Sequence, residues 1–321
     1  MGANQSIRLK SSRKQYQSCQ RKNSRGSQDS GDSNVDLNLV TSNGRIFLKN
    51  SNNEYLLAVD DIEADRLHKR HHTQWHVWKS HFSSPVKTLL NLGNMNVLDV
   101  GCGPATWLMD MATEYPQSHF TGVDIVPLYP ADRMPDNLTF IQANVMEDLP
   151  FEDGSFDYIY VNDLLAYFPG KCCKEQIFPD LLRLLKPGGW LEITEYERKL
   201  YETGPNTEFL MDKLSTVFHN RGASGIPVYE ILPDLFQNDD DLIEFRREDK
   251  FVKYCDFQLT ISEFTYVFST LKNMILEFTS MNSAKYDEIL SCACKELLKH
   301  KTSFHVTRFY AQKRTKELQL I

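Results

Sequence analysis

The chain has 321 residues, of which 41% are hydrophobic and 25% charged, a composition typical of a globular protein. It has neither a run of 18 apolar residues nor the apolar segment of a secretory signal near residue 1, so we expect no membrane-spanning helix and no secretion. The net charge of −7 argues against a nucleic-acid partner, and seven cysteines without a CxxC pair disfavour a disulfide framework and indicate a reducing, intracellular compartment.

Charge is distributed unevenly along the chain. Residues 1–28 contain seven Lys and Arg and no acidic residue, so the remainder carries a net charge of −14. Residues 1–36 also contain eight serines and almost no periodic apolar residues. Such a segment cannot bury enough surface to offset its ordering entropy, so we predict a disordered basic tail over residues 1–36.

The remaining residues read, in chain order, as a short hairpin near 44–48, a helix over 60–81 and a second helix from Pro85 to about Gly93. Strand and helix patterns then alternate: strands at 97–100, 120–123, 138–141, 156–161 and 190–194, and helices at 106–115 and 174–185. This alternation favours βαβ units and a mainly parallel sheet with helices on both faces.

The most specific local pattern is a glycine turn after the strand 97–100. Gly101 and Gly103 are separated by one residue and are followed by a helix, which permits a tight turn and close approach of a ligand to the backbone. Asp124 ends the next strand 21 residues after Gly103, where an acid commonly binds ribose hydroxyls. The pattern therefore indicates an adenosine-containing cofactor.

Two residues distinguish between such cofactors. Thr106 stands where a dinucleotide fingerprint has its third glycine, and Asp99 precedes the turn. A carboxylate at Asp99 would repel a pyrophosphate but attract an ammonium group. These residues disfavour a nucleotide-dependent oxidoreductase and favour S-adenosylmethionine, which carries an ammonium and a sulfonium but no phosphate.

The chain resembles the class I S-adenosylmethionine-dependent methyltransferases from about Asp60 to Lys313, because five segments similar to motifs of that family follow one another in the family's order. The segments are 99–103 (DVGCG), 122–125 (GVDI), 140–145 (FIQANV) with 149–151 (LPF), 151–159 (FEDGSFDYI) and 184–193 (LLKPGGWLEI). Ala105 replaces a frequent third glycine, and Asn144 replaces a frequent Asp. The resemblance implies a Rossmann-like fold with a seven-stranded, mostly parallel sheet, an antiparallel last strand and helical cap insertions.

The resemblance also implies the residues that hold the cofactor. Ile125 packs on the adenine, Asn144 hydrogen-bonds it and Val145 adds an N–H and an apolar wall. The helix before the first strand often covers the cofactor in this family, so Arg66 and Gln74 are expected to contact its carboxylate or close the site. The full expected set is Asp99, Gly101, Cys102, Gly103, Asp124, Ile125, Asn144, Val145, Asn162, Arg66 and Gln74.

Five histidines fall between residues 68 and 81, and His68, His72 and His76 share one face of the expected helix. Imidazoles four residues apart can chelate zinc. No Asp or Cys is placed nearby in sequence as a further ligand, so a polar helix face is favoured and no metal is expected.

The second half lacks family motifs. We expect a helix at 205–220, a sixth strand at 242–252, helices at 259–278 and 284–300, and a final antiparallel edge strand at 302–311. The apolar stripe of the helix 259–278 is more typical of core than of a lipid pocket. The expected organisation is a tail (1–36) and one methyltransferase domain (37–321) comprising a lid helix (60–82), a cofactor-binding core (97–197), substrate-side helices with the sixth strand (205–300) and an edge strand (302–313).

We expect in-line methyl transfer to an acceptor that the sequence does not identify. Its leaving thioether needs no proton, so the protein contributes mainly alignment and exclusion of water. A general base is needed only for a hydroxyl or a protonated amine, and Tyr167, Glu195 and Glu197 qualify by their position near strand ends. The alternative function is a protein that binds the cofactor without turnover and acts through partners at a membrane.

The first residues, Met1-Gly2-Ala3-Asn4-Gln5-Ser6, fit the myristoylation pattern M-G-x-x-x-[ST]. A single acyl chain anchors weakly, and the basic tail and palmitoylation of Cys19 would supply the additional signals for an anionic membrane. Phosphorylation of Ser11 or Ser12 would weaken this attraction. The competing interpretation is a solubilising tail with an accidental Gly2. We favour the anchor, which places the enzyme at the cytoplasmic face of a membrane.

The anchor predicts that C-terminally tagged wild-type protein sediments with cell membranes and that Gly2→Ala shifts it to the supernatant. Immunoblots of the two fractions measure the distribution. A wholly soluble wild type, or a mutant that sediments equally well, contradicts the anchor.

Overall fold

The structure is a computed structural model that describes residues 39–42, 44–48, 57–129, 134–220 and 227–315. The predicted tail, with Gly2 and Cys19, lies outside these residues, and its lipidation stays a prediction. Within the described ranges, no helix is both long enough and apolar enough to cross a membrane.

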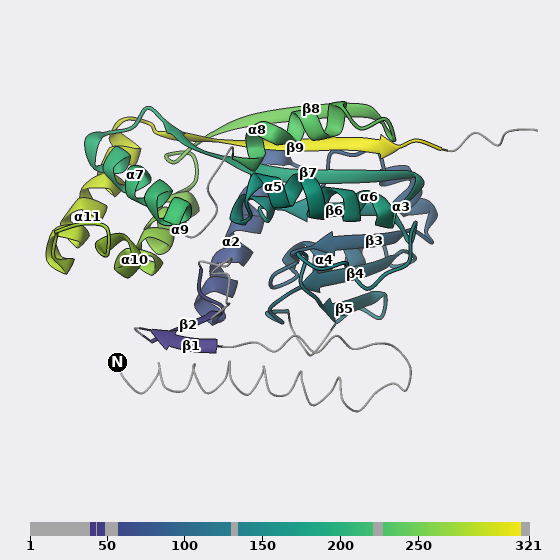
Figure 1. The fold of residues 1–321 in the computed structure, drawn as a ribbon, viewed down its shortest axis with the longest axis horizontal. Helices are drawn as coiled ribbons and strands as arrows, with labels where there is room; N and C mark the ends of the chain where they lie inside the picture. The colour runs from purple at the N-terminus through teal and green to yellow at the C-terminus, as the bar shows by residue number, and fades with distance from the viewer. Residues whose placement is uncertain (1–38, 43, 49–56, 130–133, 221–226, 316–321) are drawn as a thin grey trace, which may run out of the picture.

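The described strands form two sheets (Figure 1). The large sheet has seven strands in the order β5-β4-β3-β6-β7-β9-β8; β5 to β7 are parallel, and β9 is antiparallel to both β7 and β8. This confirms the predicted fold class. The small sheet is the predicted hairpin. The strands are β1 (Leu39–Ser42), β2 (Arg45–Leu48), β3 (Asn96–Val100), β4 (His119–Asp124), β5 (Leu138–Gln142), β6 (Phe156–Asn162), β7 (Leu185–Tyr201), β8 (Leu242–Lys253) and β9 (Ser303–Lys313).

Most helices lie where the pattern places them. They are α2 (Asp61–Trp78), α3 (Lys87–Leu92), α4 (Thr106–Glu114), α5 (Gly170–Cys172), α6 (Phe178–Leu184), α7 (Pro205–Asn220), α8 (Val228–Gln237), α9 (Gln258–Thr270), α10 (Lys272–Leu276) and α11 (Ser283–Lys299), with the short turns η1 (Leu165–Tyr167) and η2 (Cys173–Ile177). Helices α7 and α9 to α11 gather beyond one end of the large sheet (Figure 1).

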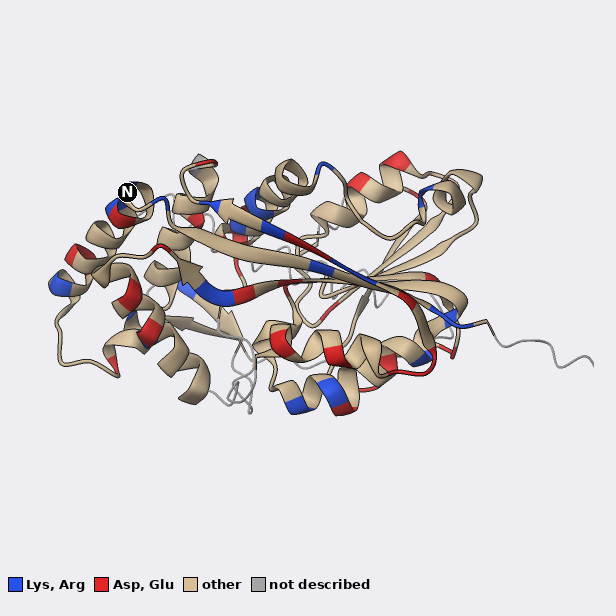
Figure 2. Cartoon of the chain, turned by 90° about the horizontal axis from the view of Figure 1, so that it is seen from above, with Lys and Arg blue, Asp and Glu red and all other residues tan. Residues whose placement is uncertain are grey.

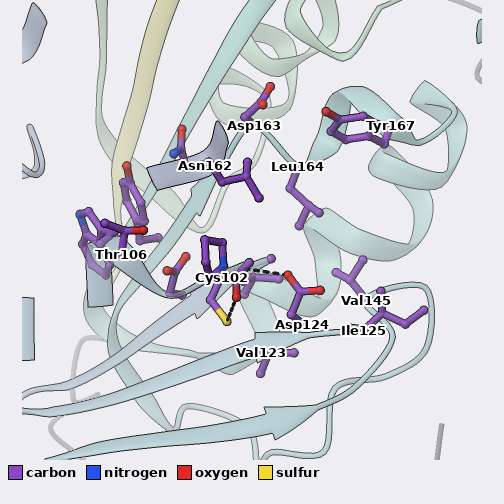
Figure 3. A pocket seen from close by; sticks show the side chains of 18 of the residues that line it. Cys102, Thr106, Val123, Asp124, Ile125, Val145, Asn162, Asp163, Leu164 and Tyr167 are labelled. Carbon is purple, nitrogen blue, oxygen red and sulfur yellow. Dashed lines mark hydrogen bonds between the residues drawn. The ribbon is translucent and has the colours of Figure 1, made fainter. Parts of the chain in front are cut away.

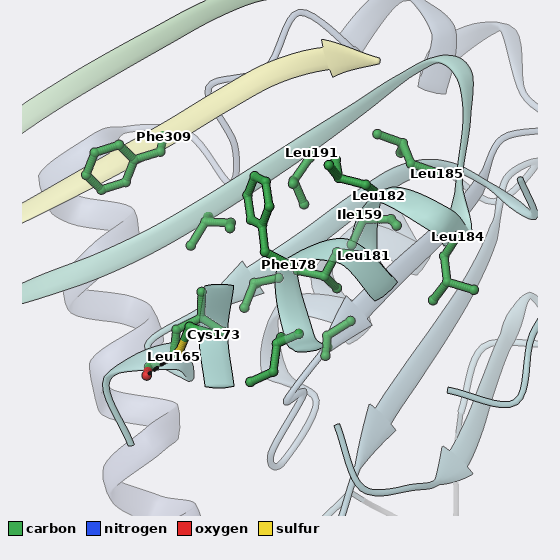
Figure 4. Close-up of a cluster of buried hydrophobic side chains, with 14 of the residues drawn as sticks. Ile159, Leu165, Cys173, Phe178, Leu181, Leu182, Leu184, Leu185, Leu191 and Phe309 are labelled. Carbon is green, nitrogen blue, oxygen red and sulfur yellow. Dashed lines mark hydrogen bonds between the residues drawn. The ribbon is translucent and has the colours of Figure 1, made fainter. Parts of the chain in front are cut away.

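The two faces of the sheet are covered by different helices because strand side chains alternate in direction. On one face, residues such as Leu98 and Ile159 pack against α6 and α8 (Figure 4). On the other face, Val97 and Tyr158 pack against α3 and α4. A third apolar cluster joins α7, α9, α10 and α11. The sheet is thus enclosed on both faces, and the third cluster forms a separate helical lobe.

The sequence predicted that the last strand lies at the edge of the sheet, and this prediction is wrong. Strand β9 lies between β7 and β8 and is buried along most of its length, whereas β8 is the edge strand and is largely exposed. Strand β8 carries the run Glu244 to Lys250 with six charged residues, and charge along an edge protects it from pairing with other chains. Figure 2 shows these charges along the long strands.

Three further elements differ from the prediction: one helix was missed, one is divided in two, and one strand begins earlier. Helix α8 was missed because Pro233 lies inside it, and an internal proline normally argues against a helix. The expected helix 259–278 is interrupted at Leu271 and forms α9 and α10. Strand β7 begins at Leu185 rather than 190, so the 186–189 segment lies within the strand, beside a register shift against β6.

Helix α2 is the predicted helix before the sheet. Asp60 caps its first turn by accepting a hydrogen bond from the Glu63 N–H, 3.1 Å away. The helix contacts α4 of the core domain and α9 of the helical lobe. Helix α2 therefore lies between the sheet with its covering helices and the helical lobe.

Candidate functional site

A cavity opens at the carboxyl ends of β3, β4 and β6 (Figure 3). The chain leaves β3 toward β4 on one side, while β6 joins β3 on the other, so this is the switch point at which open α/β sheets bind ligands. Ten of the eleven predicted site residues line this cavity: Asp99, Gly101, Cys102, Gly103, Asp124, Ile125, Asn144, Val145, Asn162 and Arg66.

The glycine turn is shaped as the sequence predicted. Gly101 and Gly103 have φ values of 77° and 52°, and a Cβ at Gly101 would lie 2.9 Å from the side chain of Leu164. The N–H groups of Gly101 and Cys102 donate to the carbonyl of Val123. Ala105 also adopts a left-handed conformation, with φ 61°, at the position where the family often has glycine.

Asp124 is fixed at the end of β4 by two backbone donors. Its carboxylate accepts hydrogen bonds from Gly103 N at 2.8 Å and Val126 N at 2.9 Å. Burial raises its pKa, and the N–H groups oppose that effect. An ionised carboxylate offers about four acceptor positions, so acceptor capacity remains for a ligand in the cavity.

Asp99 lies beneath the glycine turn and is 4% exposed. Among the described residues, its carboxyl has neither a hydrogen-bond donor nor a cation within reach. Burial, and secondarily the charge of Asp124, raise its pKa well above the usual range. A buried carboxyl that lines a cavity without a partner is suited to a cationic ligand.

The third strand end supplies a polar and apolar wall. Asn144 lines the cavity; its side-chain oxygen accepts from Met146 N at 3.0 Å, and its amide nitrogen donates to Glu147 at 3.5 Å. Ile125 and Val145 line the same cavity (Figure 3). The structure thus brings together the three residues that the sequence proposed around an adenine.

Helix α2 contributes one of its two predicted residues to the lining. Arg66 lines the cavity, but its guanidinium is already paired with Glu63 and Glu263, each at 2.7 Å. Gln74 is not among the lining residues; its amide donates to Asn162 and to the Tyr196 hydroxyl. Gln74 therefore fixes the side chain of Asn162 by hydrogen bonds without lining the cavity itself.

Sequence reasoning missed Arg70 and Asp163, which form an ion pair of 2.6 Å at the cavity wall. Asp163 has φ 52°, a conformation that non-glycine residues seldom adopt and that is often found at functional sites. Arg70 lies four residues after Arg66 on the same helix face, and Asp163 directly follows Asn162. Both spacings were available in the sequence.

The three residues proposed as bases occupy different environments. Tyr167 lines the cavity described above and also a second one beside it. Glu197 lines only the second cavity and accepts from the Tyr201 hydroxyl. Glu195 is fully buried, lines neither cavity and accepts from Leu165 N at 2.7 Å. Tyr167 is the one that reaches both cavities.

His68, His72 and His76 of α2 do not converge on a common ligand position. His68 lies against Thr106, His76 bonds the His72 carbonyl, and no shared ligand position joins the three. His71 instead bonds Asp110 at 2.7 Å, and together with His81 they place one potential ligand atom each within 4.8 Å. Asp110 is distant in sequence, so spacing could not reveal this grouping.

The second cavity lies between β7, α7 and α9. It shares Arg70, Asp163 and Tyr167 with the first, so the two cavities adjoin at these three residues. The rest of its lining is mainly apolar and aromatic: Leu57, Ala166, Tyr196, Leu200, Met211, Leu214, Phe218, Tyr254, Phe264, Val267, Phe268, Leu271 and Phe304. The apolar stripe of α9 thus serves both the helical core and a cavity wall.

Comparison with known proteins gives matches over the sheet. Residues 97–189 match the model of a methyltransferase domain family. A methyltransferase of Strobilurus tenacellus is 32% identical over 144 residues, which are 44% of this chain and 49% of that protein. An N-methyltransferase of Clonostachys rogersoniana is 29% identical over 179 residues, 53% of this chain and 61% of that protein. The chain thus spans about half the length of these relatives.

Among solved structures, a phosphoethanolamine N-methyltransferase of Haemonchus contortus with bound S-adenosylhomocysteine aligns with 80% of this chain and 60% of its own. The identity is 18% and the TM-score is 0.46.

The buried Glu195 predicts a pH-dependent stability. Burial and the charge of Asp163 raise its pKa to about 8, against roughly 4.3 in an unfolded chain. Between these values the folded protein holds the extra proton, so its stability falls as pH rises. Glu195→Gln retains an acceptor for Leu165 N, and we expect its melting temperature to fall less than that of wild type between about pH 5 and pH 8.

Thermal unfolding at several pH values measures this effect. Glu152→Gln, at an exposed position, is the matched control and should follow wild type. Parallel curves for wild type and Glu195→Gln would contradict the assignment.

Proposed function

We propose that this chain, which carries a class I methyltransferase domain with its family match over residues 97–189, is an S-adenosylmethionine-dependent methyltransferase. The observation that carries the proposal is the pair of buried carboxyls, Asp99 and Asp124, at the glycine turn. One has no partner among the described residues, and the other is held by backbone donors with acceptor positions to spare.

The residues present fit this cofactor. Asp99 offers its carboxylate to the ammonium of the methionine part, and Asp124 accepts from the ribose hydroxyls. Ile125 and Val145 enclose the adenine, and Asn144 hydrogen-bonds its edge. Arg66, paired with two glutamates, contributes to the wall rather than a free cation. When bound, the cofactor supplies a methyl group on a positively charged sulfur.

The chain's own contribution is alignment and exclusion of water. Arg70, Asp163 and Tyr167 line both the proposed cofactor cavity and the second cavity, so the two adjoin at these residues and an acceptor in the second cavity would approach the methyl group there. Helix α2 closes one side and is joined to α9 by Arg66 and Arg70 through Glu263. Holding two reactants in a dry, fixed geometry removes much of the barrier to a displacement.

The second cavity also favours an enzyme over a protein that binds the cofactor without turnover. A cofactor-binding scaffold needs no acceptor cavity beside the cofactor. Incubation of the chain with S-adenosylmethionine labelled in its methyl group and with fractionated cell extract distinguishes the two. Label transferred to one extract fraction supports the enzyme, and binding without transfer to any fraction supports the alternative.

Asp124→Ala is expected to weaken binding of S-adenosylhomocysteine by about 10- to 100-fold, because hydrogen bonds to charged groups contribute roughly 1.5–3 kcal/mol. Calorimetry measures the affinity, and circular dichroism verifies the fold. The exposed Asp148→Ala is the matched control and should bind as wild type. A folded Asp124→Ala protein with unchanged affinity would remove the ribose assignment.

Asp99 predicts that affinity depends on pH. Its raised pKa means that the carboxyl has to lose a proton to pair with an ammonium, so binding of S-adenosylhomocysteine should tighten as pH rises through that raised pKa. Asp99→Asn cannot ionise, and we expect binding weakened by about tenfold or more and a flatter pH dependence. Asp124, whose pKa is also raised, titrates in both proteins and accounts for the pH dependence of affinity that remains in Asp99→Asn.

The measurement is calorimetric affinity at a series of pH values for both proteins. Equal affinity and equal slope in wild type and Asp99→Asn would show that Asp99 does not pair with the ligand.

A further inference from the structure

The second cavity combines a long apolar wall with several charged groups. Helices α7 and α9 and strand β9 supply the apolar side, where Met211, Phe218, Phe264 and Phe304 are found. Burying apolar surface of this kind favours an apolar ligand body. The chemical class of the acceptor then depends on which charged groups remain available to it.

Most charges that line this cavity are already paired within the chain. Asp163 is paired with Arg70 at 2.6 Å, and Glu263 with Arg66 at 2.7 Å and Arg70 at 3.3 Å. Glu197 accepts from Tyr201 and lies 3.3 Å from His305. Asp163 and Glu263 are thus paired with arginines, and Glu197 accepts a hydrogen bond, so each of these carboxylates has a partner within the chain.

Arg198 is the exception. It lines the cavity from β7, and within the described part of the chain its guanidinium has neither an ion pair nor a hydrogen bond. It lies over the ring of Phe218, 4.1 Å from the centroid, which fixes its plane and leaves its edge donors free. Burial lowers its pKa, as expected for a cation without a close carboxylate.

The nearest unsatisfied acid does not neutralise Arg198. Glu195 acts on Arg198 through its charge but forms no ion pair with it, and burial raises the pKa of Glu195 to about 8. At neutral pH much of that carboxyl is therefore protonated. The cavity consequently presents, next to an apolar wall, one guanidinium that has no ion pair or hydrogen bond within the described part of the chain.

We infer that the methyl acceptor is an apolar small molecule that bears a carboxylate or another anionic oxygen group, and that Arg198 binds this group. The inference rests on the proposed function, since it identifies the second cavity as the acceptor site. A guanidinium binds a carboxylate through two parallel N–H···O bonds, which orients the ligand as well as attracting it. The apolar body then lies against the side chains of α7 and α9.

Matched acids and amides test the inference because they differ only in charge. The probes are 3-phenylpropanoate with 3-phenylpropanamide and octanoate with octanamide, each titrated by calorimetry into the full chain with and without S-adenosylhomocysteine. We expect at least one acid to bind about 10- to 100-fold more tightly than its amide. Amides that bind as tightly as their acids, or acids that do not bind, would overturn the inference.

Variants assign the preference to Arg198. Arg198→Met keeps a long apolar side chain, and we expect it to bind acid and amide equally while binding S-adenosylhomocysteine as wild type. Arg198→Lys should retain part of the preference for the acid. Lys199→Met removes the same charge from the exposed neighbouring residue and should leave the preference unchanged. An acid preference that persists in Arg198→Met would also overturn the inference.

The two proposals fail separately. Loss of S-adenosylhomocysteine binding in wild type would contradict the proposed function, whereas the comparison of acid and amide in the absence of that ligand tests the cavity and Arg198 directly.

Discussion

The structure above the sheet depends on a buried network of ion pairs between α2, α9 and the end of β6. Arg66 and Arg70 lie one turn apart on α2 and share Glu263 of α9, while Arg70 also holds Asp163. Removing one member of a buried network leaves an uncompensated charge that costs about 3–5 kcal/mol. This network therefore joins the helical lobe to the sheet, and its members Arg70 and Asp163 line both cavities.

The cavity at the glycine turn has the opposite electrostatic character. Asp99 and Asp124 are acidic groups without a nearby lysine or arginine partner among the described residues, and burial raises the pKa of both. In the second cavity, Arg198 has no ion pair or hydrogen bond among the described residues. The first cavity thus holds two acidic groups, and the second a guanidinium, that are not in ion pairs within the described residues. Unsatisfied buried charge is costly, which is why such positions favour ligand binding.

The parts that the sequence predicted are those fixed by local backbone geometry. A glycine turn between a strand and a helix, and an acid at the next strand end, lie within 26 consecutive residues, Asp99 to Asp124, so their spacing alone places them together. The pairing of β9 between β7 and β8, the ion pair of Arg70 with Asp163 and the contact of His71 with Asp110 join residues that are far apart in the chain. Helix α8 was missed for a local reason, its internal Pro233. Local patterns therefore predicted the glycine turn and the acid at the end of the next strand, and left the long-range contacts undetermined.

The same division explains what similarity to other proteins can transfer. The family match ends at residue 189, and only Asp163, Ala166 and Tyr167 of the second cavity's lining fall inside it. The other lining residues come from α2, β7, α7, α9 and their neighbours, outside the matched segment. Most residues that would contact an acceptor in the proposed site therefore lie outside that segment. The acceptor's chemistry has to be deduced from their packing and charge, and Arg198 is the residue at which that deduction becomes specific.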